Sequence, residues 1–164
     1  MAINNFDTAK AEQQINELLC GTYFYGYSFN TSFVLEFSRS FSESVSALPV
    51  TLKLYLPGGD FWFQSKEEWN GKLSLFNSQN DADLWKVEEP LQAFELTRLR
   101  WSENSEVSSV LLTDGTLAIM FKNGWELNIS CAPVEGPAWI LEGYSQNDEN
   151  SNCTITCENG EIKR

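Results

Sequence analysis

The stretch TLAIMFKNGWELNIS, Thr116–Ser130, decides the fold class of this chain. Apolar side chains alternate with smaller or polar ones on both sides of Asn123-Gly124, which is typical of strands with one buried face. This dipeptide tolerates the positive φ that a type I′ turn requires, so the stretch predicts a β-hairpin. The alternating apolar residues are Leu117, Ile119, Phe121, Trp125, Leu127 and Ile129.

The same alternation recurs outward from this hairpin, in short segments separated by turn-forming residues. Asn30-Thr31 is expected to join the first two strands, and residues 57–60 to join the next two as a hairpin. The predicted strands are 23–29, 33–37, 50–56, 61–63, 107–113, 116–121, 125–130, 138–144 and 153–157.

Helix signals are fewer. Residues 7–19 carry an apolar stripe, with Asp7 as a possible cap and Gly21 as a stop signal. Residues 65–73 predict a short second helix that begins at Ser65. Segment 91–101 fits either a helix or a strand, and the alternation of Phe94 and Leu96 favours a strand. Residues 78–89 are polar and acidic, and are interpreted as a loop with a possible strand at its end.

Together these segments predict one α+β domain spanning residues 1–164. Its main element is one predominantly antiparallel β-sheet, a meander of hairpins within residues 22–157. An N-terminal helix and a short additional helix complete it.

The charge balance is strongly negative, with 23 Asp and Glu against 11 Lys and Arg and a formal net charge of −12. An anionic surface repels nucleic acid and anionic lipid, and it accelerates encounters with basic proteins. The charge therefore indicates either a basic protein partner or a requirement for solubility alone.

The N-terminal residues lack the basic and apolar segments of a signal peptide, and no run approaches the roughly 18 apolar residues of a membrane span. We therefore expect a cytoplasmic protein. Its four cysteines, Cys20, Cys131, Cys153 and Cys157, are then expected to be reduced thiols.

Several kinds of catalytic and cofactor site are excluded by composition. The chain has no histidine, so it lacks a Ser-His-Asp or Cys-His nucleophile and a histidine metal ligand. No phosphate-binding or dinucleotide-binding motif is present. Cys153 and Cys157 lie four residues apart on a predicted strand, about 13 Å at 3.3 Å per residue, which suits two buried thiols better than a metal site. No cofactor and no metal are expected.

Tryptophans in acidic surroundings are the strongest candidates for contacts with a partner. Trp69 follows Glu67 and Glu68, Trp85 follows two aspartates, and Trp101 precedes Glu103. Aromatic anchors dominate binding energy at interfaces, and carboxylates steer a basic partner. The alternative is that these tryptophans attach loops to the core.

The second half of the chain resembles the immunity proteins of bacterial contact-dependent growth inhibition and related polymorphic toxin systems. The resemblance covers Val107–Tyr144 and rests on VLLTDGTLAIMFKNGWELNIS and PAWILEGY. It implies a non-enzymatic inhibitor that binds one cognate toxin domain. Many such toxins are DNases or tRNases with basic substrate surfaces. No residue of these families is transferred by position.

We therefore predict an acidic surface with aromatic anchors that binds a cognate toxin domain, a basic nuclease, with no direct nucleic-acid or membrane contact. The predicted partner-binding residues are Trp69, Asp81, Asp83, Trp85, Glu88 and Glu89, with Glu67, Glu68, Glu103 and Glu106 as second choices. Three alternatives remain open. They are a small-ligand-binding β domain with an aromatic pocket, a hydrolase that uses carboxylates alone, and a structural or adaptor subunit.

Overall fold

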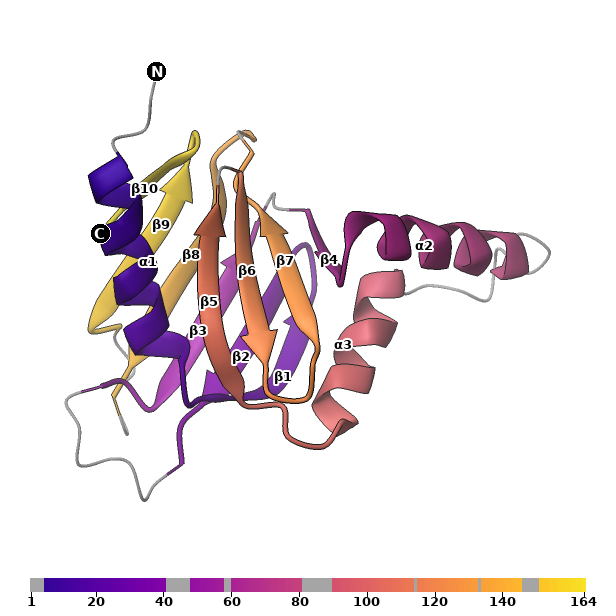
Figure 1. Cartoon of the computed structure of the whole chain (residues 1–164), viewed down its shortest axis with the longest axis horizontal. Helices are drawn as coiled ribbons and strands as arrows, with labels where there is room; N and C mark the ends of the chain where they lie inside the picture. Colours follow the sequence, from indigo (N-terminus) through magenta and orange to yellow (C-terminus); the bar gives the residue numbers. More distant parts are fainter. Residues whose placement is uncertain are drawn as a thin grey trace.

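The computed structural model describes residues 5–40, 48–57, 60–80, 90–113, 115–132, 134–145 and 151–164. Within these residues three helices and ten strands form an α+β fold (Figure 1). The strand pairs are antiparallel and an N-terminal helix comes first, as the sequence predicts. The helices are α1 (Asn5–Leu19), α2 (Lys66–Asn80) and α3 (Leu91–Trp101).

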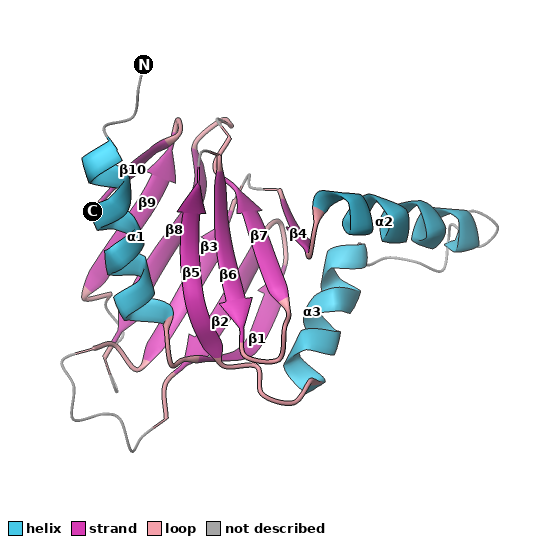
Figure 2. Cartoon of the chain, in the orientation of Figure 1, coloured by secondary structure: helices cyan, strands magenta, loops and turns pink. Residues whose placement is uncertain are grey.

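The described strands divide between two sheets, whereas the sequence predicts a single one (Figure 2). The six-stranded sheet has the order β1-β2-β3-β8-β9-β10, and the four-stranded sheet has the order β4-β7-β6-β5. The strands are β1 (Tyr23–Phe29), β2 (Phe33–Ser38), β3 (Thr51–Leu56), β4 (Phe61–Phe63), β5 (Val107–Thr113), β6 (Thr116–Phe121), β7 (Glu126–Ser130), β8 (Pro137–Tyr144), β9 (Cys153–Glu158) and β10 (Glu161–Lys163).

The hairpin predicted at residues 116–130 is confirmed as β6 and β7. The Phe121 amide donates to the Trp125 carbonyl oxygen at 2.9 Å, and the Gly124 amide donates to the Phe121 carbonyl oxygen at 3.0 Å. Gly124 has a φ of 89°, a left-handed conformation that glycine adopts without a steric cost. The remaining predicted strands also form, within one or two residues of their predicted bounds.

The two sheets pack face to face as a sandwich. Rings meet across it, because Phe33 of β2 and Phe61 of β4 lie 5.0 Å apart between centroids in an edge-to-face arrangement. Trp139, Phe37 and Phe63 are among the largest fully buried side chains of the shared core. The predicted hairpin of strands 50–56 and 61–63 does not form. β3 pairs with β2 and β8, whereas β4 pairs with β7, so these consecutive strands belong to different sheets.

A helix covers each end of the sandwich, because four strands cannot cover six. α1 lies beside β5, and its Ala11 borders the same hollow as Ile155 of β9 and Ile162 of β10 (Figure 1). α3 lies at the opposite end, against the edge strand β1. There the Tyr27 hydroxyl donates to the Ala93 carbonyl oxygen at 3.1 Å.

The predicted strand within 91–101 is wrong, since this segment is the helix α3. Leu91, Leu96 and Leu99 are buried on its inner side, with the spacing of a helix face. The alternation of Phe94 with Leu96 was misleading because α3 exposes Phe94 and buries Glu95.

α2 begins as predicted, and the Glu68 amide donates to the Ser65 hydroxyl oxygen at 3.1 Å. It continues to Asn80, beyond the predicted end at residue 73 and into the segment interpreted as a loop. α2 extends away from the sheets (Figure 1), and β10 is an additional short strand that the sequence pattern does not predict.

Candidate binding surface

The exposed apolar side chains of the described residues are concentrated on β1, α2 and α3. Among the described residues, seven large hydrophobic side chains are exposed, and six of them belong to β1, α2 or α3. Trp101 has the largest exposed fraction, 77%, followed by Tyr25 with 62%. The six are Tyr23, Tyr25, Phe29, Leu75, Phe94 and Trp101. Such a concentration of aromatic side chains on one side is characteristic of an interaction surface.

A β-bulge in the edge strand exposes Tyr25. Phe24 pairs with Phe37 and Gly26 pairs with Glu36, so Tyr25 is the extra residue on the β1 side of the ladder. Phe24 remains in the core, 3% exposed, while the bulge leaves the Tyr25 ring outside. Bulges commonly re-aim a side chain at a sheet edge, and here the re-aimed side chain reaches α3.

Arg100 of α3 joins the exposed rings. Its Cζ atom lies 6.0 Å from the centroid of the Tyr25 ring and 5.4 Å from the centroid of the Trp101 ring. Both distances fall within the range of cation–π attraction. We refer to Tyr23, Tyr25, Arg100 and Trp101 as the α3 surface.

Tyr23 connects the α3 surface to a pair of charges. Its hydroxyl donates to Glu106 Oε2 at 3.0 Å, and Lys122 Nζ lies 2.7 Å from Glu106 Oε1. The hydrogen bond from Lys122, followed by that from Tyr23, holds the pKa of the Glu106 carboxyl below its usual range. Glu106 is therefore ionised near neutral pH, and its hydrogen bond holds the Tyr23 ring at the edge of the α3 surface.

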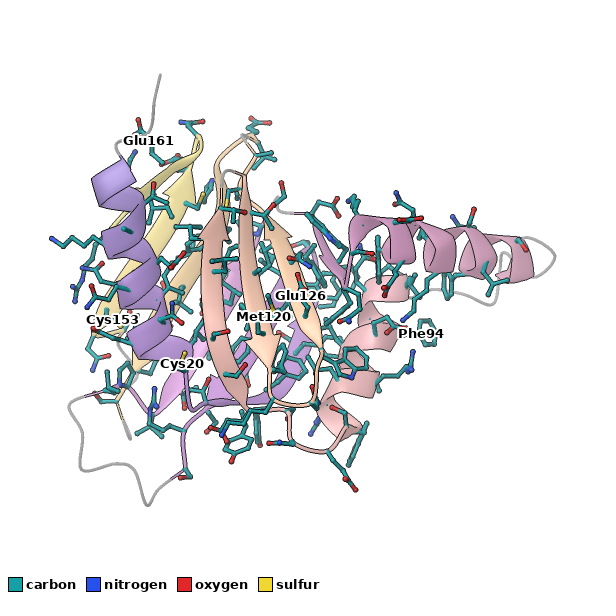
Figure 3. The ribbon with its side chains drawn as sticks, in the orientation of Figure 1. Cys20, Phe94, Met120, Glu126, Cys153 and Glu161 are labelled. Atoms are coloured by element: carbon teal, nitrogen blue, oxygen red, sulfur yellow. The ribbon has the colours of Figure 1, made fainter. Side chains whose placement is uncertain are left out.

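The helix beneath this surface is firmly attached to the rest of the fold. Leu96 and Leu99 are fully buried, and the buried Glu95 carboxylate lies 2.9 Å from Arg98 Nη1 and 3.5 Å from Lys72 Nζ of α2. In Figure 3, Phe94 projects from α3 away from the sheets. Its ring centroid lies 5.6 Å from that of Phe76 of α2. The exposed rings are thus carried on a fixed support.

Of the six predicted partner-binding residues, one is buried and five lie outside the described residues. Trp69 as a surface anchor is wrong, because it is 3% exposed and its ring centroid lies 6.3 Å from that of Phe63 in the core. The first turn of α2 turns this indole inward, while Glu67 and Glu68 remain exposed. Asp81, Asp83, Trp85, Glu88 and Glu89 lie outside the described residues, in the segment that connects α2 to α3.

Among the second choices, Glu103 and Glu106 lie close to the α3 surface. Glu103 is exposed two residues after Trp101, and Glu106 bonds to Tyr23. The sequence prediction missed Tyr25 and Arg100. The sequence YFYGYSF at 23–29 does carry a signal, because a glycine inside a strand pattern is typical of a bulge. Nothing in the sequence indicates that α3 would bring Arg100 to that bulge.

In the described part of the chain, no cluster of three potential metal ligands occurs. The buried thiols Cys131 and Cys157 lie beside Trp139, whose indole N–H donates to Cys131 Sγ at 3.4 Å. Hydrogen bonds from the Cys157 thiol and then from the Trp139 indole lower the pKa of Cys131 to about 7. The bond to Cys131, together with burial, raises the pKa of Cys157. The Cys153 thiol is half-buried, so only one of the two predicted buried thiols of β9 is fully buried.

Two hollows lie between α1 and the strands β9 and β10, with volumes of about 230 Å³ and about 320 Å³. Gln14, Ile155 and Arg164 border both of them. No aromatic side chain is among the described residues that line either hollow. They therefore differ from the aromatic pocket that one alternative interpretation requires.

No family model matches this sequence, and neither a curated protein nor a solved structure is similar to it. In the described part of the chain, no helix has the length and apolar character required to cross a membrane.

Proposed function

We propose that this protein neutralises a cognate toxin domain by binding it through the α3 surface. The observation that carries the proposal is Trp101, an indole 77% exposed whose ring centroid lies 5.4 Å from Arg100 Cζ, an atom that also lies 6.0 Å from the centroid of the Tyr25 ring. Tryptophan, tyrosine and arginine are the residues most enriched among those that dominate binding energy at protein interfaces. All three types meet here, on a helix whose opposite side is buried in the core.

The charge of the chain supports a basic partner. A net charge of −12 increases the rate at which a cationic protein is captured, and it opposes binding to nucleic acid. The segment 81–89 carries Asp81, Asp83, Glu88 and Glu89 and leads directly into α3. In this proposal its carboxylates and Glu103 steer the partner, and the exposed rings supply the area that loses contact with water on binding.

The resemblance of Val107–Tyr144 to immunity proteins supports the identity of the partner. A toxin that acts on DNA or tRNA has a basic substrate surface, and an acidic inhibitor covers such a surface by charge complementarity. The inhibitor needs no catalytic group of its own for this purpose. The proposal is therefore a non-enzymatic protein whose single task is to occupy the toxin.

The test is co-expression of the tagged protein with the product of the gene immediately upstream, followed by purification and measurement of the dissociation constant. We expect a one-to-one complex with a basic nuclease and inhibition of its nuclease activity. Trp101→Ala should weaken the complex by about tenfold or more. Leu111→Ala is the matched control, because Leu111 is also exposed, at 46%, but lies on β5.

A second variant tests the steering by carboxylates. Replacing Asp81, Asp83, Glu88 and Glu89 by their amides should slow association at low salt and have little effect at high salt. The absence of any complex at low salt would contradict the proposed function. A complex that tolerates both Trp101→Ala and the four amide substitutions would contradict this location of its interface.

In the described part of the chain, the small-ligand alternative is supported by the two hollows beside α1, whose combined lining is mainly aliphatic and polar. Volumes of about 230 Å³ and 320 Å³ lie at or below the lower end of those of small-molecule sites, roughly 300–1,000 Å³. Native mass spectrometry of the purified protein tests this alternative directly. A stoichiometric bound compound would favour it over the toxin inhibitor.

A further inference from the structure

Arg100 stands apart from most of the basic side chains of this acidic protein. Among the described residues, six lysines and arginines lie within 4.0 Å of a carboxylate oxygen, and Arg39 donates to the main-chain oxygens of Leu18 and Cys20. The described basic residues without such a partner are Lys10, Arg100 and Arg164. Lys10 is exposed on α1 and Arg164 borders the two hollows beside α1, so Arg100 is the one of these three that lies among exposed aromatic rings.

The rings around Arg100 keep its hydrogen-bond donors available. An aromatic ring is attracted to the face of a guanidinium, while its five N–H groups project in the plane of the group. Contacts with Tyr25 and Trp101 also restrict the motion of a long side chain, so less conformational entropy is lost when a partner binds. The result is an oriented cation suited to a carboxylate in a bidentate arrangement.

We propose that Arg100 receives a carboxylate of the partner protein, between Tyr25 and Trp101. This inference rests on the proposed function and deepens it. The remainder of the interface pairs carboxylates of this protein with cations of the toxin, whereas at Arg100 the signs are reversed. A toxin that carries lysine or arginine at the facing position is repelled there. One reversed pair thereby sets the register of the complex and distinguishes the cognate toxin from its basic relatives.

Phosphate has the same attraction for a guanidinium, but the surrounding charge opposes a nucleic-acid ligand. Glu103 and Glu106 both lie near this surface, within a protein of net charge −12. A protein carboxylate comes with neighbouring cations that these acidic groups attract, whereas a polyphosphate chain does not. The observations therefore favour a carboxylate on a largely basic protein.

The experiment uses the purified complex described above, with Arg100→Gln, Arg100→Lys and Arg100→Glu. We expect Arg100→Gln to raise the dissociation constant by about 10- to 100-fold and Arg100→Lys to raise it less, because lysine lacks the planar fork. Arg100→Glu should weaken binding most. Lys10→Gln is the control, since it removes an equally unpaired charge from α1, and it should leave affinity unchanged.

A charge-reversal scan of the partner identifies the facing group. Each exposed Asp and Glu of the toxin domain is changed to Arg and measured against Arg100→Glu. Restoration of affinity by one such change would confirm the pair. Thermal unfolding of every variant, with a midpoint close to that of the original protein, separates lost contact from lost folding.

Each remaining outcome has a defined meaning. If no complex forms with the unaltered protein, the proposed function fails, and the inference that rests on it fails with it. If a complex forms and tolerates Arg100→Glu, or is strengthened by it, the function stands and the inference is wrong. Self-association that Arg100→Glu abolishes would assign the surface to a second copy of this chain. Binding of a single-stranded DNA oligonucleotide that requires Arg100 would assign it to phosphate, and either result overturns the inference.

Discussion

The two ends of the sandwich are covered by helices in opposite ways. At one end α1 closes the exposed edge of β5 with its side chains. Asn16 Nδ2 donates to the Val110 carbonyl oxygen at 2.8 Å, and the Val110 amide donates to Asn16 Oδ1 at 2.7 Å. The Leu112 amide donates to Glu12 Oε2 at 2.9 Å. Because an amide side chain carries the same donor and acceptor as a peptide group, α1 takes the place of a further strand.

At the other end, α3 covers the edge strand β1 but leaves Tyr25 and Trp101 in solvent. One helix thus closes the edge of the four-stranded sheet, whereas the other covers an edge of the six-stranded sheet and leaves aromatic area exposed. At the α1 end, a helix covers the sandwich without exposing aromatic rings among the described residues. Covering an end of the sandwich therefore does not require the exposure seen at the α3 end. The proposed function accounts for this exposure, because aromatic side chains supply the contact area of an interface.

The largest expected effect concerns the buried side of each helix. Leu19→Ala in α1 and Leu99→Ala in α3 each remove a fully buried side chain. We expect each to reduce the free energy of unfolding by about 2–5 kcal/mol, measured by urea denaturation. Equal costs would show that both helices are integral to the core. A cost for Leu99→Ala below about 1 kcal/mol would mean that α3 is loosely attached. The helix would then not be a fixed support for the exposed rings.

The next effect concerns the closed edge of β5. Asn16→Ala leaves the Val110 amide and carbonyl without their partner and should cost about 1–3 kcal/mol. Gln13→Ala is the control, because Gln13 is exposed on the same helix and bonds only to Glu17. The midpoint of thermal unfolding should clearly decrease for Asn16→Ala and change little for Gln13→Ala. Equal midpoints would contradict the role assigned to Asn16.

A smaller effect is expected from Glu106, and it depends on pH. Its pKa is lowered in the folded protein, so the ionised carboxylate stabilises the fold above the unfolded pKa, near 4.5. This stabilisation is lost as the pH falls through the folded pKa. Glu106→Gln should cost about 1 kcal/mol or less at pH 7. The difference from the unaltered protein should shrink below pH 4.5 in denaturant titrations. A difference that is constant with pH would exclude this ionisation as its source.

The smallest effect on stability is expected at the exposed surface itself. Trp101→Ala should change the free energy of unfolding by no more than about 0.5 kcal/mol, because little of its side chain leaves water on folding. Urea denaturation measures this change under the conditions of the binding experiment. A large loss of stability would make Trp101 a structural residue. Its exposure at the α3 end could then not be assigned to binding.

The sequence predicts the strands well because each β-hairpin is a local structure. Asn123-Gly124 and the alternation on either side of it suffice for β6 and β7, whatever the rest of the chain does. The division into two sheets is not local. Residues 57–60 would suit a hairpin, and only the pairing of β3 with β2 and β8, and of β4 with β7, shows that β3 and β4 belong to different sheets.

The helix α3 and the surface on it were not predictable for a related reason. A periodic pattern identifies a helix when its buried residues are apolar and its exposed residues are polar. α3 violates this rule twice, because it buries Glu95 between two cations and exposes Phe94 and Trp101. These exceptions carry the candidate function, and they also obscure the pattern. Arg100 becomes notable only when the β1 bulge brings Tyr25 beside it.

The bulge in β1 has an evolutionary consequence. Phe37 and Glu36 are adjacent in β2 and pair with Phe24 and Gly26, so deleting Tyr25 would leave an unbroken ladder and an unchanged core. Position 25 lies outside the pairing of the ladder, so a substitution there leaves the alignment of the sheet unchanged. A lineage could exchange its recognition residue there while the scaffold stays constant. Under the proposed function, divergence of the toxin would be matched by substitution at a position outside the pairing of the sheet.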